Sequence, residues 1–103
     1  MNKKTKKVNG GSRLHLATNV RVARVLAGWS QEALGLHCGL KRTYIGAIER
    51  AEINPGVDNL DRIAGGLGVP SHVLLLRPDM AQPLIYREIH NLLRRGTDRA
   101  SNP

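Results

Sequence analysis

The sequence is poor in the residue types that cross-link a small fold or give it an aromatic core. Its 103 residues include one cysteine, one tryptophan, two tyrosines and no phenylalanine. The single cysteine, Cys38, excludes an internal disulfide and suits a reducing compartment. The hydrophobic content of 41% is nevertheless enough for one domain with a modest core.

Long hydrophobic runs are missing as well. No stretch of the chain approaches the roughly 20 apolar residues of a membrane span, and the beginning, MNKKTKKVNGGSR, lacks the apolar segment of a secretory signal. We therefore expect a cytoplasmic protein that contacts no membrane. The sequence also lacks a nucleophile–base pair, a phosphate-binding loop and a carboxylate dyad, so we expect no catalytic residues and no enzyme activity.

Acidic residues are scarce relative to basic ones, and the imbalance is local. The chain has 16 Lys and Arg against 8 Asp and Glu, a formal net charge of +8. Residues 1–50 contain ten basic and two acidic side chains, whereas residues 51–103 contain six of each. The whole excess lies in the first half, as expected of a protein that binds a polyanion. The alternative is that the lysines only keep the chain soluble.

Metal ligands at the usual spacings are also lacking. His37 and Cys38 are adjacent, and neighbouring residues on a helix point in different directions. The other histidines, His15, His72 and His90, match no zinc pattern. We expect no metal and no cofactor, and we interpret Cys38 as a small buried hydrophobic residue.

The chain does contain a pattern typical of two short helices joined by a tight turn, over residues 30–50. Ser30 has the side chain of a helix N-cap, so the first helix is predicted to begin at Gln31. It is predicted to end near Cys38. Gly39 then supplies the left-handed backbone conformation that the turn needs.

The second helix of this pair is predicted from Lys41 to Arg50. Its apolar residues recur at three- and four-residue steps and mark a buried face: Tyr44, Ile45 and Ile48. The remaining face carries Arg42, Thr43, Gly46, Ala47 and Arg50. Short side chains between two arginines permit close approach to a surface rich in phosphate.

Three further helices are predicted around this pair. Residues 14–27 and 60–67 have the periodicity of amphipathic helices, and a short helix follows at 71–76. Residues 73–76 are four consecutive large aliphatics, which cannot all face one core. That short helix is therefore either central to the domain or part of a subunit interface.

Both ends of the chain are predicted to differ from the central domain, residues 14–77. Residues 1–13 read as a disordered basic arm, or alternatively as a plain solubilising tail. Residues 78–95 have helical spacing and precede Gly96, a predicted stop, so residues 96–103 read as a disordered tail. The helix over 78–95 is either an added core helix or a dimerisation helix, because a lone helix of this length is marginal in water.

Residues 20–76 resemble the five-helix DNA-binding domain of the Cro and phage-repressor family, also called xenobiotic-response-element-type regulators. The resemblance is carried by Ser30-Gln31-Glu32, Leu34, Gly39, Arg42-Thr43-Tyr44-Ile45, Ile48-Glu49-Arg50, Asn54-Pro55 and Leu67-Gly68-Val69. The string GLKRTYIGAIER is most similar to the controller proteins of restriction-modification systems and to small phage or plasmid repressors. The resemblance implies an all-α, compact, lambda-repressor-like fold of five helices, here with an extra C-terminal helix.

The resemblance also implies a DNA-binding surface made of Gln31, Lys41, Arg42, Thr43, Tyr44, Gly46, Ala47 and Arg50. Arg42, Thr43 and Ala47 fall where the family reads base edges in the major groove. Gln31, Lys41 and Arg50 are implied to contact phosphates. The Tyr44 ring is expected to pack against the domain, with its hydroxyl in reach of the DNA backbone.

Arg24 and Glu49 occupy the positions of an ion pair that ties the first helix of the family to the recognition helix. Three positions depart from the family pattern. Ala51 stands where the family has a glycine, so either the turn differs or a left-handed residue there is strained by about 1 kcal/mol. Gly35 replaces an alanine and Gly56 a capping residue, which predicts a marginal monomer that gains stability from dimerisation or from DNA.

These observations lead to two functional hypotheses. The favoured one is a sequence-specific transcriptional regulator, a repressor or controller protein, that binds a two-fold symmetric operator in double-stranded DNA as a homodimer. The alternative is an antitoxin-type interaction module, which would bind a partner protein through its C-terminal helix and regulate its own operon.

Overall fold

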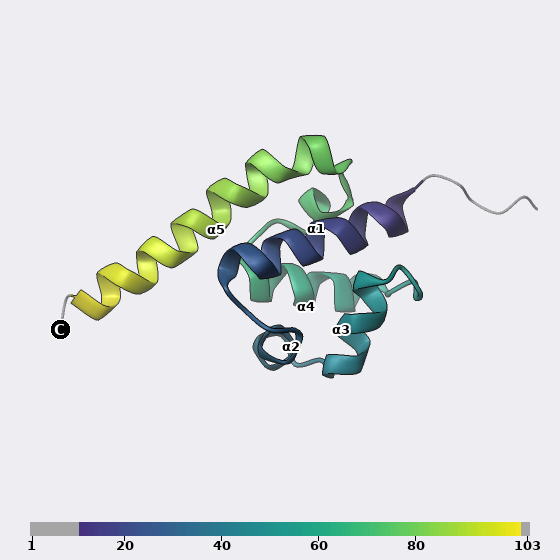
Figure 1. Ribbon diagram of the computed structural model, residues 1–103, viewed down its shortest axis with the longest axis horizontal. Coiled ribbons are helices and arrows are strands. Elements are labelled where there is room, and N and C mark those ends of the chain that lie inside the picture. The colour runs from purple at the N-terminus through teal and green to yellow at the C-terminus, as the bar shows by residue number, and fades with distance from the viewer. Residues whose placement is uncertain (1–10, 102–103) are drawn as a thin grey trace, which may run out of the picture.

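The computed structural model describes residues 11–101, with side chains through residue 95. Its elements are α1 (Ser12–Ala27), α2 (Gln31–Cys38), α3 (Arg42–Glu49), α4 (Val57–Leu67), the 3-10 helix η1 (Ser71–Leu75) and α5 (Pro78–Ser101). The all-α fold of five helices with an added C-terminal helix is thereby confirmed. In Figure 1, α1 to α4 and η1 form one globule, and α5 runs alongside α1 in the same general direction and extends past it.

The core is aliphatic, as the scarcity of aromatic residues requires. Every helix contributes to it: Val20, Leu34, Ile45, Ile63, Leu74 and Ile85 are each 0% exposed. Cys38 is buried in the same cluster, with its thiol donating to the Leu34 carbonyl at 3.0 Å. Burial raises the pKa of the Cys38 thiol, since a thiolate is poorly stabilised among apolar side chains.

A buried asparagine joins η1 to α1. The Asn19 amide nitrogen donates to the carbonyl oxygens of Leu74 and Leu76 at 2.9 and 2.8 Å. Among the residues that the structure describes, the Asn19 carbonyl oxygen has no hydrogen-bond partner. Burying an unpaired polar group is costly. The two hydrogen bonds that Asn19 donates offset that cost and hold η1 in place, although Asn19 is 0% exposed.

The short helix at 71–76 takes the tighter 3-10 form and is central to the domain. Val73 and Leu74 are buried, whereas Leu75 is 38% exposed. The four consecutive aliphatics thus divide between the core and the surface. Within the chain η1 packs on α1, α4 and α5, which agrees with the central position, one of the two predicted alternatives.

Helix α5 combines an inner and an outer part. Ala81, Ile85 and Ile89 are buried, since the first half of the helix packs on α1 and η1 (Figure 1). Tyr86 is 62% exposed and stacks on His90 one turn later. The first half of α5 is therefore an added core helix, and its outer side is available for another contact.

Three expected boundaries are wrong, all at the ends of helices. Helix α4 begins at Val57 rather than at residue 60. Helix α1 already begins at Ser12, where the left-handed Gly11 accepts the first helical bond from the His15 amide at 2.8 Å. Helix α5 does not stop at Gly96 but continues to Ser101, because a single interior glycine costs only about 1 kcal/mol. The rest of the predicted disordered ends, residues 1–10 and 102–103, lies outside the described residues.

No helix within residues 11–101 has both the length and the apolar character that crossing a lipid bilayer requires.

Candidate nucleic-acid interface

The pair α2 and α3 has the predicted geometry. The Ser30 hydroxyl accepts from the Ala33 amide at 3.0 Å, which caps α2. Gly39 ends that helix in the left-handed conformation at φ 73°, and the Leu40 amide bonds to the Gly35 carbonyl at 2.9 Å. The local signals in the sequence therefore produce the helix, the turn and the start of the next helix as expected.

Gly35 is required by the closeness of this turn. A β-carbon built at Gly35 would collide with the backbone carbonyl oxygen of Leu40. The family alanine at this position does not fit the way the chain turns here. The departure from the family pattern is thus explained by packing rather than by a loss of stability.

The two faces of α3 are divided as predicted. Ile45 and Ile48 are buried at 0% and 1% exposure. The side chains of Lys41, Arg42, Thr43 and Arg50 are exposed, and Ala47 is half-buried. The structure therefore brings the cationic and small residues of the predicted DNA-binding set to one surface.

Tyr44 is oriented by helix α4. Tyr44 is half-buried, and its hydroxyl oxygen accepts a hydrogen bond from the side-chain nitrogen Nδ2 of Asn59 at 3.0 Å. The hydroxyl hydrogen stays available to an acceptor outside the domain. The expectation that the ring packs on the domain agrees with this geometry, and Asn59 is a neighbour that the sequence did not indicate.

Gly46 lies on the predicted side of α3, on the same face as Arg42 and Arg50. It is buried, and a β-carbon there would lie 3.0 Å from Arg50 Nη1 and 3.5 Å from Gln31 Oε1. It therefore shares a face with Arg42, but the Arg50 and Gln31 side chains cover it. Its role in the structure is to leave room for these two polar groups.

A buried carboxylate joins α1, α2 and α3. Arg24 donates from Nε and Nη2 to the two oxygens of Glu49 at 2.6 and 3.0 Å, as the resemblance implied. Gln31 Nε2 donates to Glu49 Oε1 at 3.1 Å, and the Glu49 side chain is 1% exposed. The hydrogen bond to Glu49 raises the pKa of Arg24, so the Arg24 guanidinium keeps its charge and offsets that of the buried carboxylate.

Arg21 is a basic residue of this surface that the sequence did not single out. Its Nη2 donates to the Glu49 backbone carbonyl at 3.3 Å, and its side chain is 58% exposed. Its place one helical turn before Arg24 was the available signal, because residues three apart on a helix share a face. Arg21 adds a cation beside the buried carboxylate that Gln31, the first residue of α2, also contacts.

Arg50 and Glu52 form an exposed ion pair at the end of α3. Arg50 Nε and Nη2 donate to the two Glu52 oxygens at 2.9 and 3.1 Å. The Arg50 guanidinium lowers the pKa of Glu52, and the carboxylate raises the pKa of Arg50. The residue between them, Ala51, has a left-handed backbone at φ 58°, so the turn keeps the glycine geometry of the family without the glycine.

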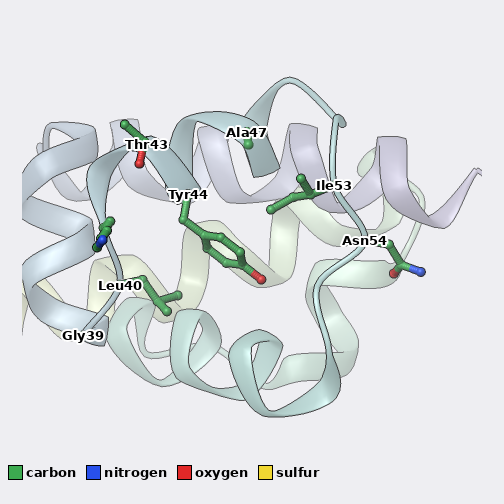
Figure 2. Close-up of a pocket in the computed structure, with 8 residues that line it drawn as sticks. Gly39, Leu40, Thr43, Tyr44, Ala47, Ile53 and Asn54 are labelled. Carbon is green, nitrogen blue, oxygen red and sulfur yellow. The ribbon is translucent and has the colours of Figure 1, made fainter.

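An open groove of about 530 Å³ runs between α3 and the loop that follows it. Figure 2 shows the Tyr44 ring in this groove, Thr43 and Ala47 along α3, and Asn54 on the loop. The polar side chains in its lining can all donate hydrogen bonds, and the Lys41 ammonium is the charged one. The rest of the lining is apolar, from Leu40, Ala47 and Ile53.

Among the described residues, no three metal-ligating side chains lie together. The His37 ring stacks on Trp29 at 3.9 Å between ring centres, and His37 Nδ1 bonds to the Ala33 carbonyl at 3.0 Å. His37 and Cys38 therefore serve the packing of α2.

Comparisons with known proteins agree with this geometry. A family model described as Helix-turn-helix matches residues 20–74. The chain is 49% identical over 63 residues to a hypothetical transcription factor of Neisseria meningitidis serogroup B, covering 61% of this chain and 59% of the relative. It is 42% identical over 64 residues to Control protein C.BamHI of Bacillus amyloliquefaciens, covering 61% of this chain and 79% of the relative.

A solved structure is also similar. The crystal structure of the hypothetical transcription factor NHTF from Neisseria matches with a TM-score of 0.66 and 45% sequence identity, covering 71% of this chain and 84% of that one. The matched family segment contains α2, the turn and α3. The chain belongs to the Cro/C1-type helix-turn-helix family of DNA-binding transcriptional regulators.

Proposed function

We propose that this chain regulates transcription by binding a specific, two-fold symmetric operator as a homodimer, with α3 in the major groove. The observation that carries the proposal is the surface of α3, where exposed cationic and small side chains lie opposite the buried Ile45 and Ile48. The relative from Bacillus is named a control protein, which supports the same class of function. Acting on DNA, the protein would work in the cytoplasm.

Three residues of α3 are proposed to read bases. Arg42 is exposed at the first turn of the helix, and a guanidinium fits the O6 and N7 acceptors of guanine. Thr43 is exposed beside it and offers a methyl group to thymine or a hydroxyl to a phosphate. Ala47 follows one turn after Thr43, where its small side chain permits close approach of the helix to the base edges.

Phosphate contacts are proposed on both sides of this helix. On one side, Gln31 gives one amide hydrogen to Glu49, and the other would bond a phosphate at the positive end of α2. Arg21 and Arg50 lie on that same side, next to Gln31 or to its partner Glu49. On the other side, Lys41 and Tyr44 line the open groove, which would follow the second strand.

The homodimer is proposed to form through the outer side of α5. Tyr86, 62% exposed, and Met80, 54% exposed, are large apolar side chains on a helix whose inner side is already buried. Such exposed apolar side chains on a packed helix are candidates for burial in a contact surface. A two-fold dimer would place two α3 helices in successive major grooves, about 34 Å apart.

Selection of bound duplexes from a random pool tests the function. The proposal predicts one enriched site of two inverted half-sites and a protein of twice the monomer mass in sedimentation. Equal, weak binding to all duplexes would overturn sequence recognition. Enrichment of a single half-site by a monomer would overturn the dimer and favour a different partner protein on α5.

A further inference from the structure

The Arg50–Glu52 pair places a carboxylate on the surface that would bind DNA. Both side chains are more than half exposed, at 56% and 55%, and they share two hydrogen bonds of 2.9 and 3.1 Å. Exposed pairs of this kind contribute little to folding stability. The pair therefore affects the charge of the proposed DNA interface more than the stability of the fold.

The position of the Arg50 guanidinium places this pair at the interface. Its Nη1 lies over Gly46, 3.0 Å from the place of a β-carbon, and the Gln31 amide borders the same spot at 3.5 Å. Gln31 and Arg50 thus lie side by side at the junction of α2 and α3. Glu52 brings a negative charge to the edge of that junction.

Glu52 occupies one of the two edges of the Arg50 guanidinium that a phosphate could bind in a bidentate way. An arginine donates five hydrogens in a planar fork and binds carboxylate and phosphate in the same bidentate way. Glu52 takes the Nε and Nη2 edge of Arg50. While the pair holds, the two residues add no net charge to the surface, and the carboxylate repels the DNA backbone.

We propose that Glu52 competes with DNA phosphate for Arg50 and thereby limits the general affinity of this interface for DNA. The inference rests on the proposed function. In the wild-type complex Glu52 keeps its hold on Arg50, so that Arg50 neutralises no phosphate and the carboxylate stays beside the DNA backbone. An interface held back in this way depends more on its base contacts, because part of its sequence-independent attraction is cancelled.

The test is the salt dependence of DNA binding by Glu52→Gln, measured on a random-sequence duplex and on the selected operator. The plot of log affinity against log salt has a negative slope, and freeing Arg50 for one phosphate makes that slope steeper by about 0.9. We expect affinity to rise about three- to tenfold at 50 mM salt and its loss between 50 and 200 mM salt to become about threefold steeper.

The matched control is Asp79→Asn. Asp79 pairs with Arg77 in the same two-residue spacing, at 3.0 and 3.2 Å, and both are exposed, at the start of α5. This variant makes the same change in net charge away from α3. If Glu52→Gln gains no more than Asp79→Asn, or binds more weakly than wild type, competition at Arg50 is refuted.

The double variant Arg50→Gln, Glu52→Gln separates pairing from binding. If the pair contributes no net attraction, the double variant keeps the wild-type slope, while Arg50→Gln alone binds more weakly because Glu52 is then unpaired. A double variant as weak as Arg50→Gln would mean that Arg50 contacts DNA despite Glu52, which overturns the inference. If the wild-type protein binds every duplex equally, sequence recognition is overturned. The salt slopes of the variants can still be compared in that case, so the two proposals are tested separately.

Discussion

Arg42 is the residue on which sequence recognition depends most directly in the proposed complex. It is exposed at the first turn of α3. Arg42→Ala is expected to weaken specific binding by about 1–3 kcal/mol and to relax the preference at one base pair. Arg77→Ala, which removes an exposed arginine before α5 and away from α3, is the control and should leave specific binding unchanged. Equal affinity of Arg42→Ala and wild type for the selected operator would rule out base reading by Arg42.

Ala51 illustrates how one backbone conformation limits stability. Its φ of 58° belongs to the left-handed region, which is costly for any residue with a β-carbon. Ala51→Gly is expected to raise the free energy of unfolding by about 1 kcal/mol, measured in urea. Gly68→Ala is the reciprocal control, because Gly68 is left-handed at φ 75°. This variant should lower the free energy of unfolding by a similar amount. A less stable Ala51→Gly would show that the strain is absorbed elsewhere.

At the scale of elements, two glycines inside helices are expected to respond in opposite directions to alanine. Gly65 in α4 is exposed, and a β-carbon there meets nothing within 4 Å. Gly65→Ala should therefore stabilise the domain by about 1 kcal/mol through helix propensity. Gly35→Ala in α2 has the same propensity gain but collides with the Leu40 carbonyl.

We therefore expect the melting temperature to rise for Gly65→Ala and to fall for Gly35→Ala. Thermal unfolding followed by circular dichroism distinguishes the two. If both variants were stabilised, the turn after α2 would be able to move away from the added methyl group, and the explanation of Gly35 by close packing would not hold.

The elements also differ in how well the sequence predicted them. Helices α2 and α3 carry their own signals, the Ser30 cap and the Gly39 turn, and these depend on neighbours within four residues. Helix α5 and η1 carry no such local signals for their length and form. Local sequence signals did not predict that α5 continues past Gly96 or that η1 is a 3-10 helix. The position of η1 depends on residues distant in sequence, because Asn19 donates hydrogen bonds to Leu74 and Leu76.

At the scale of the whole molecule, charge is the feature with a measurable consequence. The first ten residues contain four lysines. If this segment binds DNA phosphate, its removal should lower the salt slope by about 0.9 for each phosphate that it neutralises, while the selected sequence stays the same. Replacing only its four lysines with glutamine is the control for chain length. A slope unchanged by both alterations would make the segment a solubilising tail.

The sequence by itself determined the helix-turn-helix pair, the aliphatic core and the uneven charge, because caps, turns and periodicity act over a few residues. The tertiary structure decided which groups meet. It placed Gly46 under Arg50 and Gln31, brought Arg21 to Glu49, and aligned the Arg50 fork with Glu52. These contacts depend on how helices cross and on side-chain rotamers, which a pattern of residue types does not specify.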